Sequence, residues 1–95
     1  AAVEGVDCLF VGPSDLSNNL GKPGNPMDSH VLAAIERIAA AAKANGKPWG
    51  VLSKTEEFAL KCRELGCQLF SIAGDLDYIS RGIAATKSQF PAFFK

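Results

Sequence analysis

Short apolar runs alternate along this chain with longer segments in which apolar residues recur every three or four positions. The runs are CLFVG, PWGVLS and QLFSIAG, which span Cys8–Gly12, Pro48–Ser53 and Gln68–Gly74. A short continuous apolar run bounded by Gly or Pro is typical of a strand that is buried on both faces, as in a parallel sheet. The pattern therefore predicts three strands of that kind.

The segment HVLAAIERIAAAAKANG comes between the first two runs, after a connection rich in Gly, Pro and Asn. Its apolar positions have helical spacing and lie opposite its charged ones, which predicts an amphipathic helix over residues 30–46. We expect Asp28 or Ser29 to cap the start of this helix, because both side chains can accept a bond from a backbone amide. Gly46 is expected to end it.

Two further helices are predicted after the second and third runs. The segment TEEFALKCRELG follows PWGVLS, and Ser53 with Glu56 has the spacing of a capping box for this helix. Gly66 ends the segment. After QLFSIAG, we expect Asp75 to cap a last helix over LDYISRGIAATKS, and the apolar tail QFPAFFK closes the chain.

The resulting order is βαβαβα, with connections long enough for parallel crossovers. Three parallel strands leave two bare edges and a sheet face that needs further partners. We therefore expect residues 1–95 to form one partial α/β domain, the last three βα units of a (β/α)₈ barrel with parallel strands in sequential order. A complete three-layer α/β miniature is the alternative.

Composition excludes several classes of function. Ten basic residues balance ten acidic ones and neither sign forms a block, so no nucleic-acid partner and no membrane surface is expected. Neither a leader segment nor a membrane span is predicted. The three cysteines are odd in number and form no CxxC pair, which favours reduced, buried thiols in a cytoplasmic protein.

The candidate chemistry lies in FVGPSDLSNNLG, directly after the first predicted strand. Ligands of parallel α/β proteins bind at the carboxyl ends of the strands, and Asp15 follows such an end. Gly12 allows a close backbone approach and Pro13 stiffens the turn, so the amides of Ser14, Asp15 and Leu16 can form an anion-binding nest. A carboxylate beside such a nest suits a metal-bound anion. A simple capping role for Asp15 is the alternative.

The stretches GVDCLFVGPSDLSNNLGKPGNP, KPWGVL, LGCQLFSIAGD and ISRG resemble the C-terminal part of the HpcH/HpaI aldolase family. These are metal-dependent class II pyruvate aldolases, among them 4-hydroxy-2-oxoheptanedioate aldolase and 2-dehydro-3-deoxyglucarate aldolase. The pattern G-V-D-x-x-F-V-G-P-S-D-L-S-x-x-L-G is specific for the family. The resemblance implies a (β/α)₈ barrel and reversible cleavage of a 2-oxo acid to pyruvate and an aldehyde.

The resemblance also implies roles for single residues. Asp15 matches the second metal-binding carboxylate, for Mg²⁺, Mn²⁺ or Co²⁺. Ser14 and the amide of Asp15 match the backbone that holds the substrate carboxylate, in a loop shaped by Gly12 and Pro13. Leu52 matches an apolar residue of the substrate pocket. The positive charge of the metal would stabilise the enolate that forms during C–C cleavage.

No catalytic residue is assigned within this chain. The family's other metal ligand, its arginine and its histidine base come from earlier strands, and the arginines here fall on predicted helices: Arg37, Arg63 and Arg81. The sole histidine, His30, is expected to be exposed or to cap a helix. The isolated chain is therefore expected to be inactive without the remainder of the barrel.

Two alternatives to a pyruvate aldolase stay open. The first is a non-catalytic segment for oligomerisation, because the family's C-terminal helix tends to contribute to oligomer contacts and the FPAFF tail suits a neighbouring subunit; a homo-oligomer is expected in either case. The second is a related barrel lyase that acts on a CoA thioester or on phosphoenolpyruvate. The GPSDLS loop argues against this second alternative.

Overall fold

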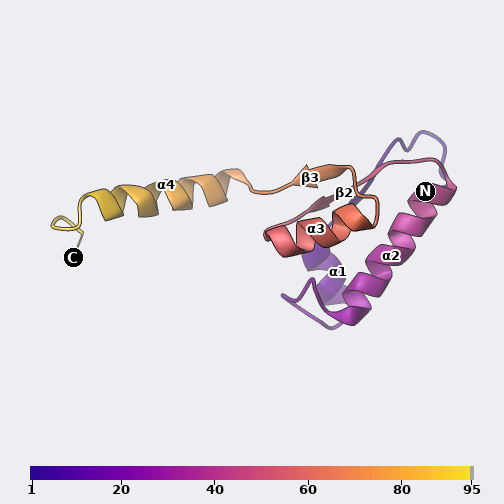
Figure 1. Cartoon of the computed structure of the whole chain (residues 1–95), viewed down its shortest axis with the longest axis horizontal. Coiled ribbons are helices and arrows are strands. Elements are labelled where there is room, and N and C mark those ends of the chain that lie inside the picture. The colour runs from indigo at the N-terminus through magenta and orange to yellow at the C-terminus, as the bar shows by residue number, and fades with distance from the viewer. Residues whose placement is uncertain (95) are drawn as a thin grey trace.

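The computed structural model describes residues 1–94 and contains three parallel strands that alternate with helices (Figure 1). In chain order the elements are β1 (Leu9–Val11), α1 (Pro13–Asn19), α2 (Ser29–Ala44), β2 (Trp49–Leu52), α3 (Glu56–Glu64), β3 (Leu69–Ser71) and α4 (Asp75–Gln89). Each strand is shorter than its apolar run, and the residues outside the strands include the apolar Cys8, Ile72 and Ala73.

The strands lie in the order β1-β2-β3, so every crossover joins neighbours in the sheet. Phe10 pairs with Gly50, and Gly50 pairs with Leu69, so the three strands share one register. This sequential parallel order is the one that barrel strands follow. It confirms the predicted α/β arrangement of consecutive βα units.

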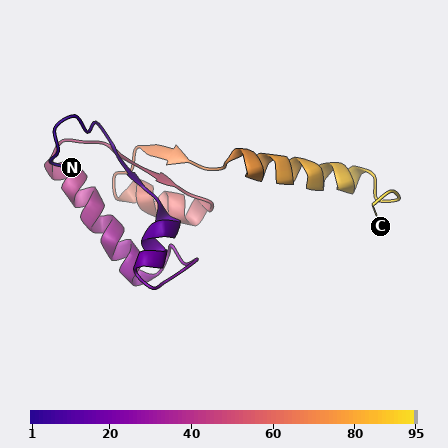
Figure 2. The same cartoon turned by 180° about the vertical axis from the view of Figure 1, so that it is seen from behind.

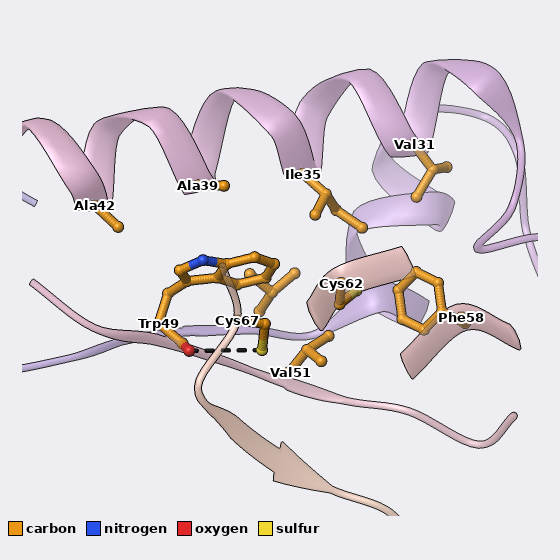
Figure 3. Packing of buried hydrophobic residues seen from close by; sticks show 10 residues of the cluster. Val31, Ile35, Ala39, Ala42, Trp49, Val51, Phe58, Cys62 and Cys67 are labelled. Atoms are coloured by element: carbon orange, nitrogen blue, oxygen red, sulfur yellow. Dashed lines mark hydrogen bonds between the residues drawn. The ribbon is translucent and has the colours of Figure 1, made fainter. Parts of the chain in front are cut away.

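Helices α2 and α3 cover one face of the sheet, and the core lies between these helices and the strands (Figure 3). Val31 and Ile35 of α2 face Phe58 and Cys62 of α3, and all four side chains are fully buried or nearly so. Trp49 is buried below α2, as strand packing predicts. Burial of these apolar side chains is the main favourable contribution to folding.

The opposite face of the sheet is bare, which corrects the expectation of strands buried on both sides. The Phe10 side chain is 54% exposed and that of Leu69 is 53% exposed, and both lie in register with Gly50. The physical reason is that successive strand residues point to opposite faces, and the helices that pack within this chain cover only one of them. The bare face is apolar and needs a partner.

Helix α4 extends away from the rest of the molecule in both views (Figures 1 and 2). None of its residues is buried, although Leu76, Ile79 and Ile83 recur at helical spacing along it. The molecule is accordingly elongated, with extents of 57 × 28 × 21 Å. Within residues 1–94, no helix has both the length and the apolar character that a membrane span requires.

Helix ends correct two predicted caps. The Thr55 hydroxyl, not Ser53, caps α3 by accepting a bond from the Phe58 amide at 3.3 Å, because Ser53 donates instead to the Thr55 carbonyl at 2.7 Å. Asp75 is the first residue of α4 rather than its cap. The cap is Gly74, whose amide donates to the Asp77 carboxylate at 2.9 Å. The Asp28 side chain caps α2 by accepting a hydrogen bond from the His30 amide. This is one of the two caps that the sequence predicted.

Candidate functional site

Val11, the last residue of β1, pairs with Val51, and β2 ends one residue later at Leu52. Helix α1 begins directly after Gly12. Asp15 lies in the first turn of α1 and its side chain is exposed to solvent. A Cβ atom built on Gly12 would lie 3.4 Å from Asp15 Oδ2, so the carboxylate folds back over the residue that directly follows β1. The carboxylate therefore lies at the carboxyl end of the sheet.

Fewer free backbone amides surround this carboxylate than the predicted anion-binding nest of three. The Leu16 amide donates to the Gly12 carbonyl at 3.0 Å and is not available to a ligand. The reason is that residues 13–19 form the helix α1, with Pro13 in its first turn. The sequence had predicted a loop here. Within residues 1–94, the amides of Ser14 and Asp15 make no hydrogen bond, as expected for the first residues of a helix.

A pocket of about 300 Å³ opens beside this turn. Ser14 and Leu52, two of the predicted site residues, line it together with buried Pro13, whereas Asp15 is not among its lining residues. The pocket also reaches the start of α3, where Phe58 contributes an apolar wall. The structure thus brings Pro13, Ser14 and Leu52 around one cavity and leaves the Asp15 carboxylate outside it.

Two residues of this pocket were missed as functional candidates in the sequence. Ser17 is 1% exposed, and its hydroxyl donates to the Ser14 carbonyl at 2.8 Å, which fixes the turn that carries Ser14. The spacing of three residues between Ser14 and Ser17 was the signal in the sequence that could have identified Ser17. Lys54 lines the pocket two residues after the end of strand β2. Its place just beyond the carboxyl end of a strand was the available signal.

This chain supplies only part of the ligand set that a metal ion needs. Within residues 1–94, no group of three or more His, Cys, Asp or Glu side chains is arranged to hold an ion. Asp15 offers one exposed carboxylate, and Mg²⁺ or Mn²⁺ needs several oxygen ligands. Any metal bound by Asp15 must take its remaining ligands from water, from a substrate or from another part of a barrel.

The contacts of His30 are those of a helix cap. Its ring nitrogen Nδ1 lies 3.1 Å from Asp28 Oδ1, and the His30 backbone amide bonds to the same oxygen at 2.9 Å. The backbone hydrogen bond from His30 is the main cause that lowers the pKa of the Asp28 carboxyl. This pair serves the start of α2, which agrees with the structural role expected for the histidine.

The three cysteines are free. Cys62 and Cys67 are buried as expected, and burial raises the pKa of the Cys62 thiol to about 11. Cys8 is exposed, contrary to expectation, because it precedes β1 and lies outside the core. Neither buried thiol is suited to act as a nucleophile, because the reactive form is the thiolate.

Comparison with known proteins gives matches over most of the chain. Residues 1–81 match the family model described as HpcH/HpaI aldolase/citrate lyase. A pyruvate aldolase from Rhizobium etli is 41% identical over 90 residues, and a 5-keto-4-deoxy-D-glucarate aldolase from Escherichia fergusonii is 43% identical over 90 residues. Each alignment covers 95% of this chain and 35% of the relative. The chain spans about a third of the length of these curated relatives.

Solved structures agree with the sequence comparison. The crystal structure of a HpcH/HpaI aldolase/citrate lyase family protein from Burkholderia cenocepacia superimposes with a TM-score of 0.79 and 34% identity. That match covers 90% of this chain and 34% of the other. The family model, the sequence relatives and the solved structure therefore all indicate the same family. This chain belongs to the HpcH/HpaI aldolase/citrate lyase family, which confirms the resemblance found in its sequence.

Proposed function

We propose that this chain is the part of a metal-dependent pyruvate aldolase barrel that carries three βα units, including one metal-binding carboxylate. The reaction is the reversible cleavage of a 2-oxo acid to pyruvate and an aldehyde. The observation that carries the proposal is the position of the Asp15 carboxylate, folded back over Gly12, the residue directly after β1. The relatives described above include a protein named pyruvate aldolase.

In this proposal, Asp15 binds a divalent cation, Mg²⁺, Mn²⁺ or Co²⁺, together with ligands from outside the chain. When bound, the cation supplies positive charge next to the keto acid, where negative charge develops as the C–C bond breaks. The amides of Ser14 and Asp15 bind the carboxylate of the substrate, which is supported by their lack of other acceptors in residues 1–94. Leu52 excludes water from the apolar part of the substrate.

Ser17 and Pro13 hold this turn in place rather than contact the reacting atoms. The buried Ser17 hydroxyl bonds to the Ser14 carbonyl, and Pro13 is also buried. The bare sheet face around Phe10 and Leu69 packs against side chains of the other barrel strands in this proposal. We place the protein in the cytoplasm, because its three cysteines are unpaired.

The proposal is tested by a chimera, because the chain supplies only part of the site. The last third of the Rhizobium etli pyruvate aldolase, to which this chain is 41% identical, is replaced by residues 1–95. Cleavage of the relative's 2-oxo acid substrate is followed as pyruvate release with added Mn²⁺. We expect an active chimera, and Asp15→Asn is expected to reduce activity and Mn²⁺ affinity by at least about 100-fold, since even outer-shell partners of a metal contribute 10–100-fold.

Two controls accompany the chimera. Glu36→Gln removes an exposed carboxylate of α2, outside the family pattern, and should leave activity within about twofold. The 95-residue chain alone should release no pyruvate. A folded chimera without activity, or one whose activity survives Asp15→Asn, would contradict the proposed function. Activity of the isolated chain would contradict the need for residues outside it.

A role in oligomerisation is the second candidate, and α4 favours it. The helix has no buried residue, its apolar positions Leu76, Ile79 and Ile83 form a stripe, and Phe93 beyond it is 82% exposed. An exposed apolar surface of this extent marks a contact with another protein surface. We assign α4 and the aromatic tail to the interface of a homo-oligomer, a role that is compatible with the aldolase proposal.

A further inference from the structure

Two serines carry the only buried hydroxyl groups in the part of the chain that the structure describes. Ser17 is 1% exposed and Ser53 is 2% exposed. A buried hydroxyl is costly unless it is hydrogen-bonded, because it has lost its contacts with water. Both hydroxyls have a partner in the backbone, so each of them holds one particular part of the main chain.

The two partners are carbonyl groups in the wall of one pocket. Ser17 Oγ donates to the Ser14 carbonyl at 2.8 Å, and Ser53 Oγ donates to the Thr55 carbonyl at 2.7 Å. Ser14 and Thr55 both line the pocket, and they belong to the segments that follow β1 and β2. One buried serine therefore supports each of these two segments.

The Ser17 hydrogen bond also fixes the direction of the Asp15 amide. The Ser14 carbonyl and the Asp15 N–H belong to one planar trans peptide unit, so they point in opposite directions. A hydroxyl that holds the carbonyl on one side of this unit therefore holds the N–H on the other side. That N–H donates to no acceptor in residues 1–94, and it is one of the two amides assigned above to the substrate carboxylate.

The Ser53 hydrogen bond fixes the turn between β2 and α3. The Ser53 amide donates to the Ser71 carbonyl at 2.8 Å, so its backbone is still tied to the neighbouring strand β3. Its hydroxyl reaches forward to the carbonyl of Thr55, which is the N-cap of α3. Leu52 directly precedes Ser53 and lines the pocket. The bond therefore links the residue next to Leu52 to the first residue of the following helix turn.

We infer that Ser17 and Ser53 are positioning residues that hold the two walls of the site in the arrangement that binds substrate. Ser17 directs the Asp15 amide toward the substrate carboxylate, and Ser53 keeps the Leu52 wall in place. Both hydroxyl protons go to backbone carbonyls, so each serine acts through the main chain. The inference rests on the proposed function for the identity of the substrate. The order of the two peptide units does not depend on metal, substrate or turnover.

The first test measures backbone order in the ¹⁵N-labelled 95-residue chain by NMR relaxation. A rigid amide has an order parameter of about 0.85, and a flexible one falls below about 0.6. Ser17→Ala should lower the order parameter of the Asp15 amide toward the flexible range. Ser53→Ala should do the same for the Glu56 amide, which shares a peptide unit with the Thr55 carbonyl.

Two further variants complete this test. Ser88→Ala removes an exposed hydroxyl that donates to the Ala84 carbonyl of α4 at 3.0 Å, and it should leave the Asp15 and Glu56 amides unchanged. Ser17→Cys keeps most of the side-chain volume but donates only weakly, so it should give an intermediate order parameter at Asp15. The cysteine variant takes the place of Ser17→Ala where the alanine variant does not fold.

The second test uses the active chimera described above. Ser17→Ala and Ser53→Ala should each raise KM for the 2-oxo acid by about three- to tenfold, the range of one hydrogen bond. Their kcat should stay within about twofold, because the affected contacts bind the ground state and the transition state equally. A purely structural role would instead lower the folded fraction, and with it the apparent kcat, at an unchanged KM.

Unchanged order parameters at Asp15 and Glu56 in the serine variants would overturn the inference, and so would unchanged KM values beside a lower kcat. A folded but inactive chimera that carries the original sequence contradicts the proposed function instead. The order parameters are measured without substrate, so they decide the positioning role in that case, and the two proposals fail separately.

Discussion

Gly50 lies in register with Leu69 and so close to it that a side chain has no room. A Cβ atom built on Gly50 would lie 2.8 Å from the Leu69 Cβ atom and 2.9 Å from the Leu69 carbonyl oxygen. The φ angle of Gly50 is not in the left-handed region, so the requirement for glycine here is one of space. The neighbouring Phe10 ring, 3.0 Å from the same position, closes the gap from the other strand.

Gly50→Ala is expected to lower the free energy of unfolding by about 1–3 kcal/mol, because the added methyl group overpacks a site bounded by backbone. Urea denaturation followed by the fluorescence of the buried Trp49 measures the change. Gly82→Ala in α4 is the matched control. A Cβ atom there meets nothing within 4 Å, so that variant should be neutral or slightly more stable. Equal stability of both variants would contradict the close packing at Gly50.

Thr55→Ala should destabilise the chain by about 1 kcal/mol, because the Phe58 amide loses the hydroxyl oxygen that caps α3. Glu56→Gln tests the capping box that the sequence suggested with Ser53. The structure gives the Glu56 side chain no bond to a backbone amide in residues 1–94, so this variant should change stability by less than about 0.5 kcal/mol. Thermal unfolding monitored by circular dichroism separates the two outcomes.

The buried thiols predict a loss of stability at alkaline pH. Burial raises the pKa of Cys62 from 9.0 to about 11 in the folded chain. Below pH 9 the thiol is protonated in both states, so its contribution to stability is fully present. Between pH 9 and about 11 the unfolded chain releases the proton while the folded chain keeps it, which favours unfolding. Urea titrations at several pH values should show this decline, and Cys62→Ala should make it shallower.

Thiol modification provides a second measure of the same burial. Iodoacetamide at pH 8 should modify exposed Cys8 rapidly and reach Cys62 and Cys67 only when the chain unfolds. Mass spectrometry of timed samples counts the modified thiols. Three equally fast modifications in the folded chain would contradict the core shown in Figure 3.

Ile79→Lys should reduce self-association of the chain without loss of its fold, because α4 contributes no buried residue to the core. Ala85→Lys, on the opposite side of the helix, is the matched control and should leave association unchanged. Sedimentation velocity measures the mass of each variant, and Trp49 fluorescence reports on the core. Identical masses for the original chain and both variants would argue against α4 as an interface.

Much of the fold followed from local rules. Continuous apolar runs bounded by Gly and Pro marked the three strands, and helical periodicity marked α2, because one face of a helix recurs about every 3.6 residues. Expected caps marked the starts of α3 and α4. Gly46 and Gly66 ended their helices with positive φ, as residues without a Cβ atom can. Helix α1 was not predicted, because its seven residues have little apolar periodicity and start at a Gly-Pro pair that is typical of turns.

The site shows the same division. The order of residues placed Ser14 and Asp15 after a strand end, and the family resemblance added Leu52, which is the last residue of β2. Parallel strands bring such positions to one edge of the sheet. Only the tertiary structure decided that the Leu16 amide is used inside α1, that Lys54 lines a pocket, and that one sheet face stays bare. These features depend on which elements pack together. Local sequence sets the period of each element, but packing between distant elements sets what each side chain meets.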